Sequence, residues 1–178
     1  GESMLVDTGF RHPLSIQALR TALEELAVDP ASMQIFITHA HTDHFGSVCE
    51  FANDDTTIYM SETDYQIYRE CMTPGKWGTS DHFYMAEGFP EEGLLQLVKT
   101  NPARKYMPDK IFHANYISDG MKIKLGNIDC VCVKANGHSP GHFCLYLPEY
   151  EIMLLGDHVL FDITPNIACW LGVEDSLG

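Results

Sequence analysis

The stretch "ITHAHTDHFGSV", residues 37–48, places three histidines and an aspartate within six positions, directly after an apolar run typical of a strand. In an extended segment residues two apart face the same way, so His39 and His41 can present two imidazoles to one metal ion. Asp43 and His44 then turn into a helix and can face a second ion alongside. Imidazole suits zinc and iron, and a carboxylate adds negative charge that holds a dication. The stretch therefore predicts a metal site at the end of a strand.

Two later stretches carry residues of the same kind. "NGHSPGHF", residues 136–143, sets His138 in a turn rich in glycine and proline between two expected strands. "LLGDH", residues 154–158, sets Asp157 at the end of another strand. Loops at strand ends on a rigid sheet are where site residues collect, so both residues join the candidate site.

The rest of the chain alternates expected strands and helices without repeats. Helices are expected at 15–27 and from Ser61 to 71, and strands at 3–9, 33–38, 56–60, 121–125, 128–135, 142–147 and 152–157. The later strands predict a second half that is mainly antiparallel. Residues 72–113, rich in proline and in aromatic residues from Trp77 to Phe89, read as an irregular, partly helical insertion. This insertion either roofs a substrate pocket or forms a separate hydrophobic cluster.

Composition narrows the class of protein. The 178 residues are 45% apolar, which suits one globular domain with a full core. A formal charge of -14 disfavours nucleic acid as a partner. Apolar runs are too short to span a membrane, and no leader precedes them. The six cysteines form no Cys-x-x-Cys pair, so we expect reduced, mostly buried thiols in a cytoplasmic protein.

The histidine stretch resembles the signature His-x-His-x-Asp-His of the metallo-β-lactamase superfamily. The similarity runs from "VDTG" at 6–9 through "GHSPGH" at 137–142 to "GD" at 156–157. The resemblance implies an α+β fold, a four-layer α/β/β/α sandwich with the site at one edge of the two sheets. We therefore expect one metallo-β-lactamase-like domain over residues 1–178.

The resemblance also implies roles for individual residues. The implied ligands are His39, His41 and His138 for one metal, Asp43 and His44 for a second, and Asp157 as a bridge between them. Asp43 and Asp157 thereby become the catalytic residues as well. Asp7 corresponds to a carboxylate that supports the metal histidines. His142 matches a position that is usually not a ligand, so it is either a support beside the ligands or an exposed turn residue. The implied cofactor is two zinc ions per complete domain, and iron or manganese fit the same ligand types.

The chain departs from the family pattern at both ends. Members usually supply one more histidine from a loop beyond the bridging aspartate, and no histidine follows His158. A strand hairpin usually precedes the "VDTG" strand. We therefore expect an incomplete sandwich with a weakened second metal site. His158 is a poor substitute because neighbouring strand residues point to opposite faces. Sheet edges left open in this way favour pairing with a second copy.

The function implied is that of a metal-dependent hydrolase, in which a metal-bound hydroxide attacks an ester-like bond of a small molecule. A thioester, as in the glyoxalase II branch, or a lactone is expected first, because the β-lactamase branches lack a bridging aspartate at Asp157. Two alternatives stay open. One is a di-iron redox protein of the flavodiiron type, which has Glu in place of His41. The other is a catalytically incomplete metal-binding module.

Overall fold

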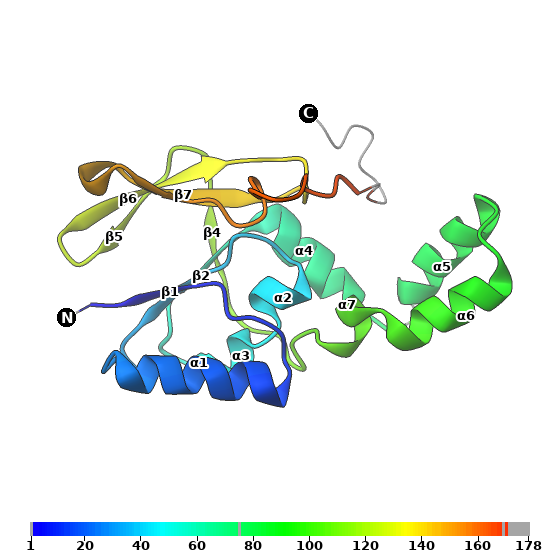
Figure 1. Ribbon diagram of the computed structural model, residues 1–178, viewed down its shortest axis with the longest axis horizontal. Coiled ribbons are helices and arrows are strands. Elements are labelled where there is room, and N and C mark those ends of the chain that lie inside the picture. The colour runs from blue at the N-terminus through cyan, green and yellow to red at the C-terminus, as the bar shows by residue number, and fades with distance from the viewer. Residues whose placement is uncertain (1, 75, 169, 171–178) are drawn as a thin grey trace.

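The computed structural model describes residues 2–74, 76–168 and 170. Two four-stranded sheets lie face to face, and helices cover the outer face of one of them (Figure 1). The strands are β1 (Met4–Val6), β2 (Gln34–Phe36), β3 (Ile58–Ser61), β4 (Asn115–Ile117), β5 (Lys122–Leu125), β6 (Ile128–Lys134), β7 (Phe143–Leu147) and β8 (Ile152–Leu154). The helices are α1 (Pro13–Glu25), α2 (Thr42–Phe45), α3 (Val48–Phe51), α4 (Glu62–Cys71), α5 (Lys76–Ala86), α6 (Glu91–Thr100), α7 (Pro102–Lys105) and the 3-10 helix η1 (Pro148–Tyr150).

The first sheet is parallel, in the order β1-β2-β3-β4, and β2 lies inside it. Successive side chains of this strand point to opposite faces. Ile35 packs among residues of α1 and α4, including Leu23 and Tyr68, whereas Phe36 packs against the second sheet. Because β2 is covered on both faces, the chain that leaves its carboxyl end is held rigidly where His39 follows.

The second sheet is antiparallel, in the order β5-β6-β7-β8, which confirms the antiparallel character expected of the second half. Its inner face contributes Ile123, Cys130, Cys132, Phe143 and Leu145 to the core between the sheets. The two cysteines on β6 are free and fully buried, as expected of small hydrophobic residues.

Two parts of the chain differ from the sequence prediction. Strand β4 was not expected, because it has three residues of which two are exposed and therefore shows no apolar run. Residues 72–113 are more helical than expected, since they contain α5, α6 and α7. Two prolines there begin helices and do not interrupt them: Pro90 lies at the N-cap of α6 and Pro102 at the start of α7.

The mixed α and β architecture with two facing sheets confirms the fold class expected from the sequence. Among the described residues, three of the four layers are present: helices, the parallel sheet and the antiparallel sheet (Figure 1). Helices α5 and α6 project as a hairpin away from the sheets (Figure 1). Within the described part of the chain, no helix is long and apolar enough to cross a membrane.

Candidate metal centre

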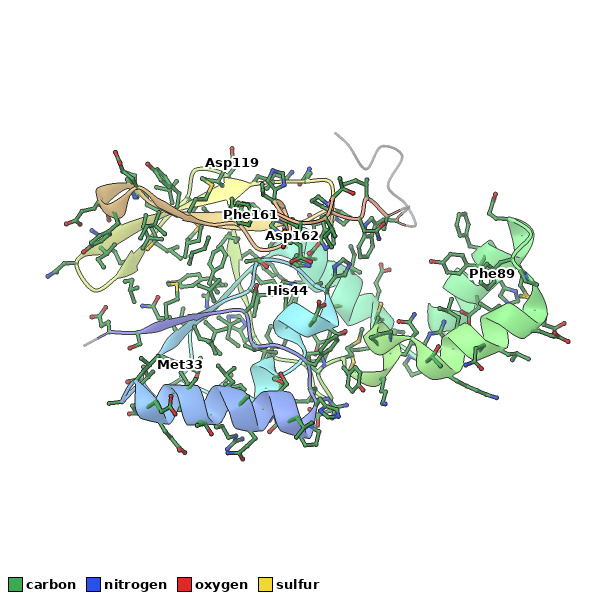
Figure 2. All side chains as sticks on the ribbon, viewed as in Figure 1. Met33, His44, Phe89, Asp119, Phe161 and Asp162 are labelled. Atoms are coloured by element: carbon green, nitrogen blue, oxygen red, sulfur yellow. The ribbon has the colours of Figure 1, made fainter. Side chains whose placement is uncertain are left out.

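The predicted ligands come from three loops that meet at one edge of the two sheets. His39 and His41 lie between β2 and α2, and Asp43 and His44 lie within α2. His138 lies between β6 and β7, and Asp157 follows β8. A backbone hydrogen bond of 2.9 Å from Phe143 N to Thr38 O joins the two sheets at this edge. Figure 2 shows His44 between the two sheets, close to the carboxyl end of β1.

Three imidazoles form the first cluster. His39 Nε2 lies 3.0 Å from His41 Nδ1, and His41 Nδ1 lies 2.8 Å from His138 Nε2. One ring nitrogen from each of the three lies within 4.8 Å of the other two. This is the set predicted for the first metal.

Hydrogen bonds at the far side of two rings fix which nitrogen faces the cluster. Thr38 Oγ1 donates to Asp7 and therefore accepts from Nδ1 of His39, 3.0 Å away. Nδ1 of His138 donates to the backbone oxygen of Asn166 over 2.8 Å. In the neutral rings Nε2 then carries a lone pair, so lone pairs converge on one point. Such an arrangement suits a cation, and an outer hydrogen bond is the usual support of a histidine ligand.

Burial keeps two of these rings neutral. It lowers the pKa of His39 far below its ordinary value, and the neighbouring histidines His44 and His41 lower that pKa further. Burial and His138 also lower the pKa of His41, to about 4. Because a histidine binds a metal only in its neutral form, both rings are ready ligands at pH 7.

The second cluster is built around His44. Its Nδ1 donates to Asp7 Oδ2 over 2.8 Å, which leaves Nε2 facing Asp157 Oδ1 at 3.3 Å and Asp43 Oδ2 at 3.8 Å. Burial alone lowers the pKa of His44, but the hydrogen bond to Asp7 and the charges of Asp7, Asp157 and Asp43 outweigh it and raise that pKa. Ligand atoms of His39, His44 and Asp157 also lie within 4.8 Å of one another.

Asp157 faces both clusters. Its Oδ1 lies 3.3 Å from His44 Nε2, and its Oδ2 lies 3.3 Å from His138 Nε2. Asp157 follows Gly156, whose φ of 51° is a left-handed conformation. A Cβ at Gly156 would lie 2.8 Å from His142 Nε2 and 2.9 Å from Thr38 Oγ1. The glycine thus allows the β8 loop to approach the histidines closely.

Asp7 lies where the sequence placed a supporting carboxylate. Besides His44, it accepts hydrogen bonds from Thr38 N at 2.9 Å and Thr38 Oγ1 at 2.8 Å. Its φ of 60° is unusual for an aspartate, and such strain persists where surrounding contacts over-determine the backbone. Asp7 therefore links the start of the β2 loop to the second cluster.

His142 is fully buried, so the alternative of an exposed turn residue is wrong. Its ring stacks on His39 with centroids 4.9 Å apart, and it belongs to neither ligand group. Neither ring nitrogen has a hydrogen-bond partner among the described residues. Burial, together with His138 and His158, lowers its pKa to about 4. His158 itself is exposed and lies outside both groups.

Sequence reasoning missed three residues at this centre. Asp64 is completely buried and binds two of the site loops, yet in sequence it is one acidic residue of an amphipathic helix. Asn166 supplies a backbone oxygen, which no side-chain pattern reveals. Trp170 stacks on His41 with centroids 5.6 Å apart. The only signal for the last two was the polar and aromatic character of the segment after β8.

The aromatic residues of the insertion do not act as one group. The ring of Tyr84 contacts those of Phe83 and Phe89, with centroids about 6 Å apart in each pair, which favours a separate hydrophobic cluster over a roof for the site. Phe112 packs in the main core against Tyr68. The side chain of Trp77 lies outside the described residues.

The donor set fits divalent metal ions. The first group offers three imidazole nitrogens, and the second offers two imidazole nitrogens and a carboxylate oxygen; no thiol takes part in either group among the described residues. Such sets suit zinc, iron and manganese. The two ligand groups share His39, and Asp157 of the second group also faces His138 of the first.

Comparison with known proteins supports the resemblance seen in the sequence. The sequence profile of the Metallo-beta-lactamase superfamily matches residues 1–176. A protein of Aquifex aeolicus (strain VF5), described as an uncharacterized protein, is 24% identical over 158 residues, which are 88% of this chain and 59% of that protein.

Solved structures share the fold. A metallo-beta-lactamase family protein from Thermus thermophilus matches with a TM-score of 0.77 and 24% identity, over 93% of this chain and 54% of that chain. A beta-lactamase domain protein from Burkholderia ambifaria matches with a TM-score of 0.72 and 21% identity, over 92% of this chain and 47% of that chain. The chain thus spans about half the length of these relatives. Since the profile match covers nearly every residue, the chain belongs to the metallo-beta-lactamase superfamily.

Proposed function

We propose that this protein is a metal-dependent hydrolase that acts on an ester-like bond of a small molecule. The observation that carries the proposal is the placement of Asp157, whose two oxygens each lie 3.3 Å from a histidine of a different cluster. Divalent ions held in this way lower the pKa of a water ligand and polarise the bond under attack. Hydrolysis needs no serine or cysteine nucleophile in such a site.

The chain's own residues hold and orient the reacting groups. Asp7 fixes His44, and Asn166 fixes His138, so that each ring presents a single nitrogen to the site. Asp43 is the most exposed of the six predicted ligands that lie at this edge, with 49% of its side chain accessible. Its carboxylate is therefore the predicted ligand that a substrate entering from solvent reaches first.

The substrate class follows from the same aspartate. By the family resemblance, the β-lactamase branches lack a bridging aspartate at this position, which favours a thioester or a lactone over a β-lactam. Zinc is the proposed metal, because neutral imidazoles with a few carboxylates are its common ligands. The charge of -14 favours a small molecule over nucleic acid as substrate. Five described cysteines are free, in line with a cytoplasmic protein.

The test is a substrate panel with the zinc-loaded protein. A thioester, a lactone, a β-lactam and a phosphodiester are offered at equal concentration, with the chelator-treated protein and the double variant His39→Ala with His138→Ala as controls. Zinc-dependent cleavage of the thioester or lactone, absent in both controls, supports the proposal. Cleavage of none of the four refutes hydrolysis. Bound iron that cycles between oxidation states would instead favour a di-iron redox protein.

A further inference from the structure

Asp64 is a buried carboxylate that contacts none of the predicted ligand side chains. It lies in the first turn of α4 with 0% exposure. Its Oδ2 accepts hydrogen bonds of 2.8 Å from Ala40 N and Ser139 Oγ, and its Oδ1 accepts one of 2.8 Å from Gly141 N. Each oxygen is therefore satisfied, although neither reaches the metal centre.

The donors belong to the two loops that supply the first cluster. Ala40 stands between His39 and His41, and Ser139 follows His138. The two loops are nearly 100 residues apart in sequence, as the separation of 97 between His41 and His138 shows. One carboxylate thus joins the backbone beside all three imidazoles. The distance between the two loops, and hence between the imidazoles, depends on this group.

A carboxylate at this depth is costly to the fold. Burial raises the pKa of Asp64, and the hydrogen bonds from Ala40, Ser139 and Gly141 act against that rise. Among the described residues no lysine or arginine forms an ion pair with it. The three hydrogen bonds offset part of this cost, and all three come from the two loops of the first cluster.

The backbone around Asp64 is shaped to admit it. A Cβ at Gly141 would lie 2.6 Å from Asp64 Oδ1 and would also collide with Ser61 Oγ. Ser61 caps α4 by accepting a hydrogen bond of 3.1 Å from Asp64 N. This hydrogen bond fixes the backbone of Asp64 and so the position from which its side chain extends. Glycine at 141 and serine at 61 therefore both fix Asp64 against the His138 loop.

We propose that Asp64 is the positioning residue of the first metal cluster: it holds the His39–His41 loop against the His138 loop so that their ring nitrogens meet. Asp7, which binds Nδ1 of His44, does the corresponding work for the second cluster. Each cluster then has its own carboxylate behind it, fully buried at Asp64 and partly buried at Asp7. The inference rests on the proposed function only in requiring that the clusters bind metal.

The test compares Asp64→Asn with Asp7→Asn by cobalt(II) titration of the metal-free protein. Absorption reports each ion as it binds, so no substrate is needed. Asparagine keeps the shape of Asp64 but turns an amide toward Gly141 N or toward Ala40 N. We expect Asp64→Asn to weaken binding at the first cluster by roughly 10–100-fold, the range for loss of an outer hydrogen-bond partner, and to spare the second. Asp7→Asn is expected to weaken the second cluster more than the first, because Asp7 binds His44 directly and reaches His39 only through Thr38.

Two further variants separate positioning from stability. Ser139→Ala removes one of the three hydrogen bonds and should give a smaller loss at the same cluster. Asn101→Ala removes the side chain that caps α7 in the insertion, where it accepts a hydrogen bond of 2.8 Å from Ala103 N. This variant leaves every contact of Asp64 in place, so it should lower the melting temperature of the metal-free protein without changing cobalt affinity. A merely structural Asp64 would behave like Asn101.

The outcomes are distinct for the two claims. If the unaltered protein binds two cobalt ions and Asp64→Asn binds both with unchanged affinity, the positioning role is refuted and the proposed hydrolase is untouched. Loss of affinity at both clusters in equal measure also refutes it. If the unaltered protein binds no cobalt, the positioning role and the proposed function fail together. Selective loss at the first cluster supports the inference even if no substrate is cleaved.

Discussion

Oδ1 of Asp157 lies 3.3 Å from Nε2 of His44, and its other oxygen lies at the same distance from His138. One carboxylate thus stands between His44 and His138, two imidazoles from loops more than 90 residues apart. Because Asp157 faces both clusters, they form a single centre, and a substitution of Asp157 should affect metal binding at both.

The first prediction concerns the charge of this bridge. Asp157→Asn keeps the size of the side chain and removes its negative charge. We expect fewer than two zinc ions per chain and a fall in hydrolysis at least as large as the roughly 10–100-fold that loss of an outer partner causes. Mass spectrometry measures the metal content of the variant, and the rate of thioester cleavage measures its hydrolytic activity. Asp54→Asn, which changes an exposed carboxylate outside both ligand groups, is the matched control. Two tightly bound ions in Asp157→Asn would speak against a bridge.

A second prediction concerns the close approach of the β8 loop. Gly156→Ala would place a Cβ 2.8 Å from His142 Nε2. It would also put alanine in a backbone conformation with a φ of 51°, which alanine disfavours. The left-handed conformation alone costs about 1–2 kcal/mol. Gly120→Ala, at φ 71° with nothing within 4 Å, carries the backbone cost without the contact. Denaturant unfolding should show a larger loss for Gly156→Ala than for Gly120→Ala. Equal losses would mean that the loop does not press on His142.

The third prediction is the pH dependence of the metal-free protein. The pKa of His41 and that of His142 are both lowered to about 4 in the folded chain, against an ordinary value of 6.5. Between these values the unfolded chain binds protons that the folded chain does not, so stability falls as the pH falls from 6.5 towards 4. Each unit corresponds to about 1.4 kcal/mol, and the loss should reach a few kcal/mol. The raised pKa of His44 offsets part of this loss of stability, because the folded chain binds that proton more tightly than the unfolded chain does.

Chelator-treated protein unfolded by urea at pH 7.5 and at pH 5 measures this difference. His142→Leu removes one of the two titrating rings from the folded core, so its stability should vary less with pH. An unchanged slope in this variant would show that His142 takes no part in the acid loss.

The fourth prediction concerns metal uptake by the second cluster. Nδ1 of His44 already donates to Asp7, so the proton held by the raised pKa of this ring sits on Nε2, the atom that faces Asp157. That proton must leave before a metal binds. His39 and His41 are neutral over the same range, because their pKa values are lowered. Cobalt titration at pH 6 and pH 8 should therefore show a greater loss of affinity on acidification at the second cluster. A greater loss at the first would contradict the protonation pattern.

Much of this centre was predictable because its signals are local. His39, His41, Asp43 and His44 lie in one short stretch after a buried strand, and periodicity alone places them together. Their places in loops at strand ends added His138 and Asp157, and the family resemblance added Asp7. The fold brings all three to the same edge.

Other features gave no local signal. Asp64 accepts a hydrogen bond from Ser139, which is 75 residues away in sequence, and Asn166 accepts one from His138 through its backbone oxygen. Neither hydrogen bond produces a recognisable spacing of residue types in the sequence. Strand β4 is too short and too exposed to show an apolar pattern in the sequence. It forms because it pairs in parallel with β3. The prolines of the insertion suggested breaks, but Pro102 starts a helix because its missing N–H is not needed there.

The most direct test of the account is the number and identity of metal ions per chain, measured on the zinc-loaded protein alongside the double variant His39→Ala with His138→Ala. Removal of these two rings disrupts the first cluster and takes one member from the second group. We predict two zinc ions per unaltered chain, and at most one in the variant. No bound metal in the unaltered protein, or the same content in both proteins, would contradict a metal centre built from these residues.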